Sequence, residues 1–253
     1  MGWVAPSKAV EACQFGDAVW HADSLAGHEG EVVASGHALL DAQLPGGGWP
    51  VGALCEVLQS HCAQGEWRLL LPALCAAQQA FSTSSSTSAA KKPSVSNTWV
   101  ALIAPPHTPF GPALAAQGLD VSRLLWIKAQ SASERLWATE QALRCADVAA
   151  VLAWLPQVQS THLRRLHMAA GSHAKLLFVM RPASAQHESS PAVLRLLLNP
   201  PARVLHIVAE APATEPNPNA LHLQLLKRRG PPLAQTLVLP ALWSGHALDR
   251  LAA

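Results

Sequence analysis

Two hydrophobic patterns alternate along the middle of the chain and predict an α/β fold. Short continuous apolar runs are typical of buried strands, whereas apolar residues that recur every three or four positions are typical of helices. We expect strands at 53–58, 98–104, 124–129, 148–155 and 175–180, and helices at 110–118, 133–146 and 160–172. This alternation favours a mostly parallel central sheet flanked by helices.

The helix that follows the first strand contains a proline. Residues 66–81 have helical composition, with Pro72 early in the segment. Because proline has no backbone N–H, it is tolerated best in the first turn of a helix. The helix is therefore predicted to begin near 68–71. Ser133 is the predicted N-cap of the helix 133–146, and Gly118 is the predicted end of the helix 110–118.

The last third of the chain has a different character. We expect a short helix at 190–198 and strands at 204–209, 221–226 and 237–239, joined by the proline-rich segments 210–219 and 230–232. In the strand 221–226 leucines alternate with His222 and Gln224, which predicts one buried face. These strands are expected to add to the edge of the sheet in antiparallel orientation.

The pattern divides the chain into three parts. Residues 31–240 form the predicted core domain, between an N-terminal segment (1–30) and a C-terminal tail (241–253). A short helix is expected at 14–26. The segment 31–53 is rich in glycine and proline, and its stretch Leu-Pro-Gly-Gly-Gly-Trp-Pro at 44–50 cannot be a helix or a central strand. The segment 82–97, of low complexity, is predicted to be a flexible surface insertion.

Composition excludes several classes of protein. With 50% hydrophobic and 13% charged residues, the chain has enough apolar surface to fold. Its longest apolar runs are shorter than the roughly 18 residues of a membrane span. A net charge of +2 leaves DNA contact possible through a local patch but not strongly indicated. Five scattered cysteines and no apolar leader favour a reducing cytoplasm.

The loop 59–67, between the first strand and its helix, occupies the position of a phosphate-binding loop. Such a loop needs a lysine for the phosphates and a serine or threonine for magnesium. Here Gln64 and Gly65 are followed by Glu66 and Trp67. A carboxylate repels phosphate, and it also suits the positive end of the helix, so the loop is interpreted as degenerate.

Other catalytic and metal sites are weakly supported. No aspartate or glutamate occurs between Asp147 and Glu188, so the strand 148–155 has no acid to hold a metal for nucleotide hydrolysis. The spacing of Cys55, His61, Cys62 and Cys75 matches no zinc pattern, and the chain has no G-x-S-x-G elbow. We therefore expect no catalytic residue, metal or cofactor.

Two basic clusters are candidate partner or DNA contacts. Arg164 and Arg165 lie on the helix 160–172, and Lys227, Arg228 and Arg229 end the strand 221–226. The second cluster has two interpretations: it is the solvated end of a strand, or it contacts an anion or an acidic partner. The scarcity of charge in this chain favours the contact.

Several further motifs extend over roughly residues 20–240. The main ones are Leu-Pro-Gly-Gly-Gly-Trp-Pro at 44–50, Ala-Pro-Pro at 104–106, Leu-Ala-Trp-Leu-Pro at 152–156, Leu-Arg-Arg-Leu at 163–166 and Lys-Arg-Arg-Gly at 227–230. They resemble RecA recombinases and, more closely, the ImuA family of RecA-like proteins of bacterial translesion DNA synthesis. The resemblance implies a RecA-like fold. The position that resembles the catalytic glutamate of RecA holds Pro106, which implies that hydrolysis has been lost.

The resemblance implies a non-catalytic adaptor of damage-induced mutagenesis. Such proteins are thought to bind RecA and ImuB, a Y-family-like protein, beside an error-prone DnaE-type polymerase. One alternative is a SulA-like inhibitor of cell division that binds FtsZ, because 69–74, 154–155 and 178–182 also resemble SulA. SulA-like chains are shorter and lack the segments 44–50 and 227–230. A second alternative is an active RecA-like ATPase, which the missing lysine disfavours.

Overall fold

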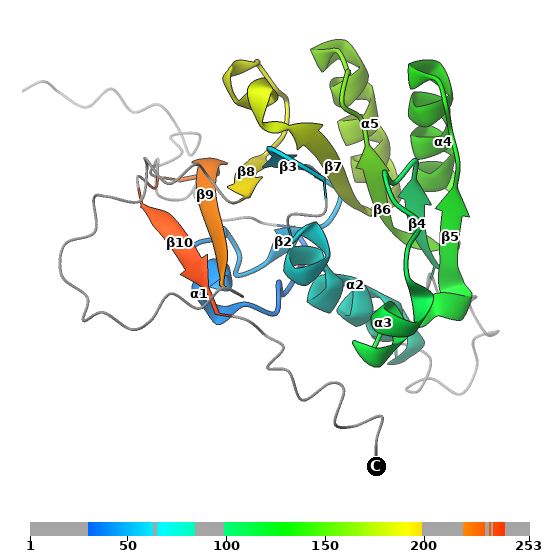
Figure 1. Ribbon diagram of the computed structural model, residues 1–253, viewed down its shortest axis with the longest axis horizontal. Coiled ribbons are helices and arrows are strands. Elements are labelled where there is room, and N and C mark those ends of the chain that lie inside the picture. The colour runs from blue at the N-terminus through cyan, green and yellow to red at the C-terminus, as the bar shows by residue number, and fades with distance from the viewer. Residues whose placement is uncertain are drawn as a thin grey trace, which may run out of the picture.

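A mostly parallel sheet of eight strands forms the centre of the molecule (Figure 1). The computed structural model of the chain describes residues 30–62, 65–83, 99–198, 220–230, 233 and 235–240. The strand order is β10-β9-β8-β3-β7-β6-β4-β5. The strands are β3 (Leu54–Gln59), β4 (Trp99–Ile103), β5 (Leu124–Ile127), β6 (Val148–Trp154), β7 (Leu176–Pro182), β8 (Leu194–Leu198), β9 (Leu221–Lys227) and β10 (Thr236–Leu239). Strand β9 is antiparallel to both neighbours, and the other pairs are parallel. The predicted α/β class is confirmed.

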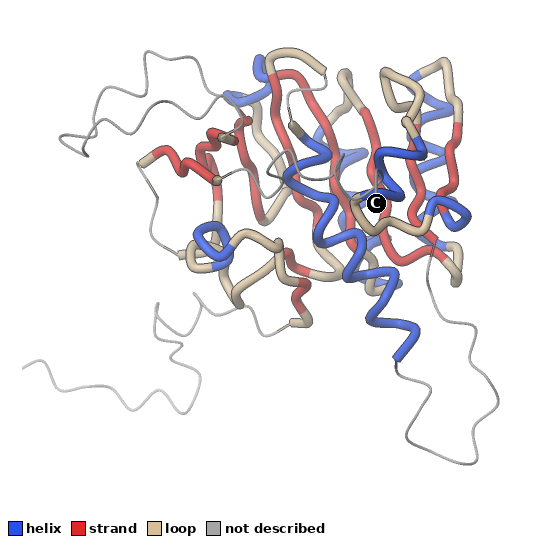
Figure 2. Tube along the Cα trace, turned by 60° about the horizontal axis from the view of Figure 1, so that its bottom comes forward, coloured by secondary structure: helices blue, strands red, loops and turns tan. Residues whose placement is uncertain are grey.

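Helices cover both faces of this sheet. In Figure 1, α4 (Ala132–Arg144) and α5 (Ser160–His173) stand side by side on one face, with α2 (Glu66–Thr83) and α3 (Gly111–Ala116) on the other. Figure 2 turns the second face forward and shows α2 crossing the strands. Two short 3-10 helices are η1 (Val121–Arg123) and η2 (Ala183–His187). No helix in the described ranges is long and apolar enough to cross a membrane.

A small antiparallel ribbon precedes the central sheet. Strand β1 (Val32–Val33) pairs with β2 (Trp49–Pro50), and α1 (Ala38–Asp41) lies between them in the sequence. The predicted absence of a helix and of a central strand from 44–50 is therefore confirmed, although the short helix α1 was not predicted. The ribbon is anchored by Trp49, which is fully buried and packs edge-on against Phe178, with ring centroids 5.1 Å apart.

The predicted helix at 190–198 is wrong, because residues 194–198 form the buried strand β8, parallel to β3. Leucines at 194, 196, 197 and 198 fill both faces of the sheet, so the run has no clean alternation. Arg195 can lie in this buried strand because Glu56 lies directly opposite it on β3. That partner is 139 residues away and leaves no local signal.

The predicted N-cap of α4 is also wrong. The cap is Ser131, whose hydroxyl accepts a hydrogen bond from the backbone N–H of Glu134 at 3.2 Å. The Glu134 carboxylate in turn accepts from the backbone N–H of Ser131, which completes a capping box. Ser133 cannot form this box, because the glutamate must lie three residues after the cap. The backbone N–H groups of Gln130 and then of Ser131 donate to the Glu134 carboxylate and hold its pKa below the ordinary value.

Pro72 lies inside α2, which begins at Glu66 and not at the predicted 68–71. In an unbroken helix the N–H of residue 72 would donate to the carbonyl of Arg68. Here the ring Nε2 of His37 approaches that carbonyl oxygen at 3.2 Å and replaces the missing donor. Gly36 permits the approach, since a Cβ on it would lie 2.4 Å from the Cβ of Pro72. The proline is therefore accommodated by a partner from outside the helix.

Replacing His37 with alanine is expected to cost about 1–3 kcal/mol of stability, because the partly buried carbonyl of Arg68 loses its donor. Burial lowers the pKa of His37 from its ordinary 6.5. The folded chain therefore binds this proton more weakly than the unfolded chain. The contribution of neutral His37 to stability is fully present above pH 6.5. It is lost as the pH falls through the pKa of His37 in the folded chain, which is lower than 6.5.

Urea denaturation of the wild type and of His37→Ala between pH 5 and 8 measures this effect. The difference in stability between the two proteins should shrink as the pH falls. A pH-independent difference would contradict the role assigned to His37.

Several predicted segments lie outside the described residues. They are the helix at 14–26, the strand at 204–209, the turn at 210–219, the tail 241–253 and the insertion 82–97 beyond Thr83. Ser82 and Thr83 belong to α2. The other predicted strands and helices are confirmed within a few residues.

Candidate functional site

A cavity of about 400 Å³ opens where the parallel strands end, and we call it the carboxyl-end cleft. Ligands of open α/β sheets bind at this edge. Its lining comes from the ends of β3, β4, β6 and β7 and from α4: Gln59, Ser60, His61, Cys62, Ala104, Pro106, Arg135, Trp154, Pro156, Met180, Arg181 and Pro182. None of these residues is an aspartate or a glutamate, so the cleft supplies no carboxylate to hold a metal or activate water.

The loop between β3 and α2 has the strand–loop–helix arrangement of a phosphate-binding loop. Gln64 lies outside the described residues. Glu66 is the first residue of α2 and is 2% exposed, and Trp67 packs against the core. The N-terminus of a helix attracts an anion, and here the chain's own carboxylate stands at that end. Glu66 and Trp67, which are predicted to replace the lysine and the serine or threonine of a phosphate-binding loop, are therefore the first two residues of α2.

A leucine from β9 packs against the same loop. Gly65 adopts the left-handed region at φ 113°, and a Cβ on it would lie 2.6 Å from Cδ1 of Leu221. The first residue of β9 therefore packs directly on the glycine of the loop. An apolar contact at this point offers nothing to a charged phosphate group.

Other parts of the cleft also lack the groups that hydrolysis needs. Pro106 is exposed after β4, and Trp154 is buried at the end of β6, where a strand acid would stand. The described residues include no group of three histidine, cysteine or acidic side chains placed to hold a metal. Cys55 is 1% exposed and belongs to the core, and this burial raises the pKa of its thiol.

A buried ionic network, which the sequence did not reveal, lies beside the cleft. Both oxygens of the fully buried Glu56 are used: Arg195 donates to one at 2.6 Å and Arg181 to the other at 3.2 Å. Arg181 also donates to Glu188 at 2.6 Å. Arg195 donates to three carbonyls at the end of η2, those of residues 185, 186 and 188. The network fixes η2 against the sheet, which is a structural role.

The two predicted basic clusters have different surroundings. Arg165 pairs with Glu140, which also accepts from Arg144 at 2.6 Å, while Arg164 is exposed. Lys227 donates to the carbonyl of Ser190 at 3.0 Å, and Arg228 donates to the carbonyl of Gln43 at 2.6 Å. Lys227 and Arg228 therefore tie the end of β9 to two neighbouring segments. Arg229 points elsewhere, into a second cavity.

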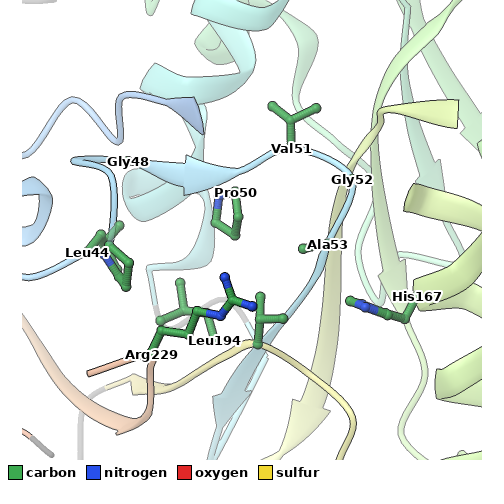
Figure 3. A pocket seen from close by; sticks show the side chains of 11 residues that line it. Leu44, Gly48, Pro50, Val51, Gly52, Ala53, His167, Leu194 and Arg229 are labelled. Atoms are coloured by element: carbon green, nitrogen blue, oxygen red, sulfur yellow. The ribbon is translucent and has the colours of Figure 1, made fainter. Parts of the chain in front are cut away.

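This second cavity, of about 220 Å³, lies at the amino ends of β3 and β8, and we call it the amino-end pocket (Figure 3). Two segments that carried the resemblance, 44–50 and 227–230, meet at it. Leu44, Pro50 and Leu194 provide apolar walls, and the Arg229 guanidinium points between Pro50 and Leu194. His167 extends from α5 toward Ala53, and its Nδ1 accepts the backbone N–H of Leu54 at 3.1 Å.

Comparison with known proteins gives one partial relative. No protein-family model matches the chain. The cell division inhibitor SulA of Edwardsiella piscicida is 32% identical over 84 residues, which are 33% of this chain. The match spans 50% of the SulA sequence, so the chain covers about half the length of this relative. A relation to SulA over a third of the chain is therefore shown.

Proposed function

We propose that the chain is a RecA-like adaptor without ATPase activity, which acts through protein contacts in damage-induced translesion DNA synthesis. Its partners are RecA and a Y-family-like protein of the ImuB type, beside an error-prone DnaE-type polymerase. The observation that carries this proposal is the carboxyl-end cleft. A sheet of the expected class supports that cleft. Pro106 and Trp154 line it, and Glu66 and Leu221 lie at the adjoining loop and helix start, and none of these four side chains suits a phosphate or its metal.

The relation to SulA supports the general setting. SulA is by its name an inhibitor of cell division, and we expect proteins of this type and of the ImuA type to act in the same response to DNA damage. The segments 44–50 and 227–230, which SulA-like chains lack, form part of the folded structure here and meet at the amino-end pocket. They favour the adaptor over the division inhibitor.

A division inhibitor that binds FtsZ is the second candidate, favoured by the 32% identity over 84 residues. Pull-down with purified RecA, the Y-family-like partner and FtsZ, at low ionic strength, separates the two candidates. We expect retention of RecA and of the Y-family-like partner, and no retention of FtsZ. Retention of FtsZ alone would replace the adaptor proposal with the division inhibitor.

Changing Lys227, Arg228 and Arg229 together to alanine is expected to weaken RecA binding, more at low salt than at high salt. Basic side chains at an interface act mainly on the association rate and its salt dependence. Because Lys227 and Arg228 also hold internal carbonyls, the single variant Arg229→Ala accompanies the triple variant. Unchanged RecA affinity in both variants, each with a native melting curve, would remove this cluster from the interface.

The purified chain is expected to release no phosphate from ATP above the buffer rate, with or without single-stranded DNA. Glu66 would repel the phosphates, and none of the described residues that line the carboxyl-end cleft has a carboxylate that could hold magnesium. Steady-state phosphate release measures this directly. ATP turnover that disappears on changing Glu66 to alanine would show that the loop is catalytic and would contradict the proposal.

A further inference from the structure

The amino-end pocket is built by segments that the fold holds in place. Pro50 belongs to the ribbon anchored by Trp49, Ala53 immediately precedes β3, and Leu194 begins β8. Arg228 ties the segment before Leu44 to the end of β9 by donating to the carbonyl and side-chain oxygens of Gln43, at 2.6 and 3.2 Å. The apolar walls are thus fixed before any ligand arrives, which reduces the entropy cost of binding.

Two polar side chains, Arg229 and His167, line this pocket. Arg229 is exposed and points into the pocket (Figure 3), and no hydrogen bond or ion pair joins its guanidinium to another part of the described chain. His167 accepts the N–H of Leu54 at Nδ1, so its hydrogen lies on Nε2. Burial and then the nearby Lys227 lower the pKa of His167. None of the residues that line the pocket carries a carboxylate.

We propose that the amino-end pocket binds a segment of a partner protein in which an apolar side chain stands next to an aspartate or glutamate. The apolar side chain enters the space between Leu44, Pro50 and Leu194, and the carboxylate is held by the guanidinium of Arg229. Arginine suits this role because its planar fork donates two parallel hydrogen bonds to one carboxylate.

The size of the pocket agrees with one anchoring side chain. Cavities that enclose cofactors and other small molecules measure roughly 300–1,000 Å³. At about 220 Å³ the pocket is smaller than these and is close to the needs of a single large apolar residue. An apolar anchor seated beside a charge pair at the rim is a common plan of protein interfaces.

This proposal deepens the adaptor role by giving the chemistry of one partner segment, and it rests on the proposed function only in expecting a protein partner. A random peptide library tests it without RecA. The peptides are fused at their C-termini to a phage coat protein, so none presents a free α-carboxylate. We expect selection on the full chain to enrich sequences with an apolar residue adjacent to aspartate or glutamate.

A synthetic peptide from this selection then separates the pocket from general attraction to positive charge. Arg229→Glu is expected to weaken its binding by roughly tenfold or more. Lys128→Glu makes the same reversal of charge just after the edge strand β5, four strands away from β3, and should leave binding within about twofold.

No enrichment, enrichment without an acidic residue, or equal binding to the wild type and Arg229→Glu would each overturn the proposal. Because the screen contains no RecA, these results leave the adaptor function to its own pull-down. Failure of the pull-down, with enrichment intact, would instead separate the pocket from RecA.

Discussion

Replacing Glu56 with alanine is expected to lower the free energy of unfolding by about 3–5 kcal/mol. The carboxylate is fully buried, and its two partners, Arg181 and Arg195, have side chains only 2% and 8% exposed. Removing it leaves two guanidinium groups in the protein interior with Glu188 as their one remaining acidic partner. Urea denaturation monitored by tryptophan fluorescence measures the loss.

Glu140 provides a matched control, because it too binds two arginines. Its partners Arg144 and Arg165 are 55% and 62% exposed, so water solvates them when the carboxylate is removed. Glu140→Ala is expected to cost about 1 kcal/mol or less. Replacing Glu56, Arg181 and Arg195 together by leucine, methionine and leucine should recover much of the stability lost in Glu56→Ala. Equal losses in the two alanine variants would contradict the importance given to burial.

Replacing Trp49 with alanine is expected to destabilise the chain by about 3–5 kcal/mol. Its ring is fully buried and packs on Phe178 of the central strand β7, so truncation leaves a cavity between the ribbon and the sheet. The adjacent wall of the amino-end pocket should loosen as well. Faster hydrogen exchange at the backbone amides of Val51 and Gly52, measured by mass spectrometry under native conditions, would report that loosening.

Trp137 on α4 is the control for this variant, since its side chain is 65% exposed. Trp137→Ala is expected to change stability by about 0.5 kcal/mol or less, as surface substitutions usually do. If Trp49→Ala melted at the same temperature as Trp137→Ala, the ribbon would have no anchoring contact with the core.

The alternation of strands and helices could be predicted because β4, β5 and β6 are continuous apolar runs, whereas apolar residues in the helices recur every three or four positions. Two of the errors occurred where the structure depends on residues far away in the sequence. Strand β8 contains an arginine, and only Glu56 across the sheet makes that tolerable. The start of α2 depends on His37, which supplies the donor that Pro72 lacks. Neither partner can be located from the local pattern.

The replacement of residues in the loop pattern could be identified from the sequence because it is a local feature, and the loss of catalysis that it implies stays a prediction. The sequence did not predict that Leu221 packs on Gly65 or that Arg229 enters a pocket built by the segment 44–50. Both contacts join residues more than 150 positions apart. The sequence contained one hint of this pocket: the segments 44–50 and 227–230 both carried the resemblance to the ImuA family, and neither had an evident role of its own.

The frequency of damage-induced mutations in a strain that lacks the gene tests the central claim most directly. Cell length after the same DNA damage is measured in parallel, with a complemented strain as reference. The adaptor account predicts that induced mutations fall to the level of a strain without the Y-family-like partner, while filament length stays unchanged. An unchanged mutation frequency, together with cells that resume division early and stay short, would contradict the account and assign the chain to the control of division.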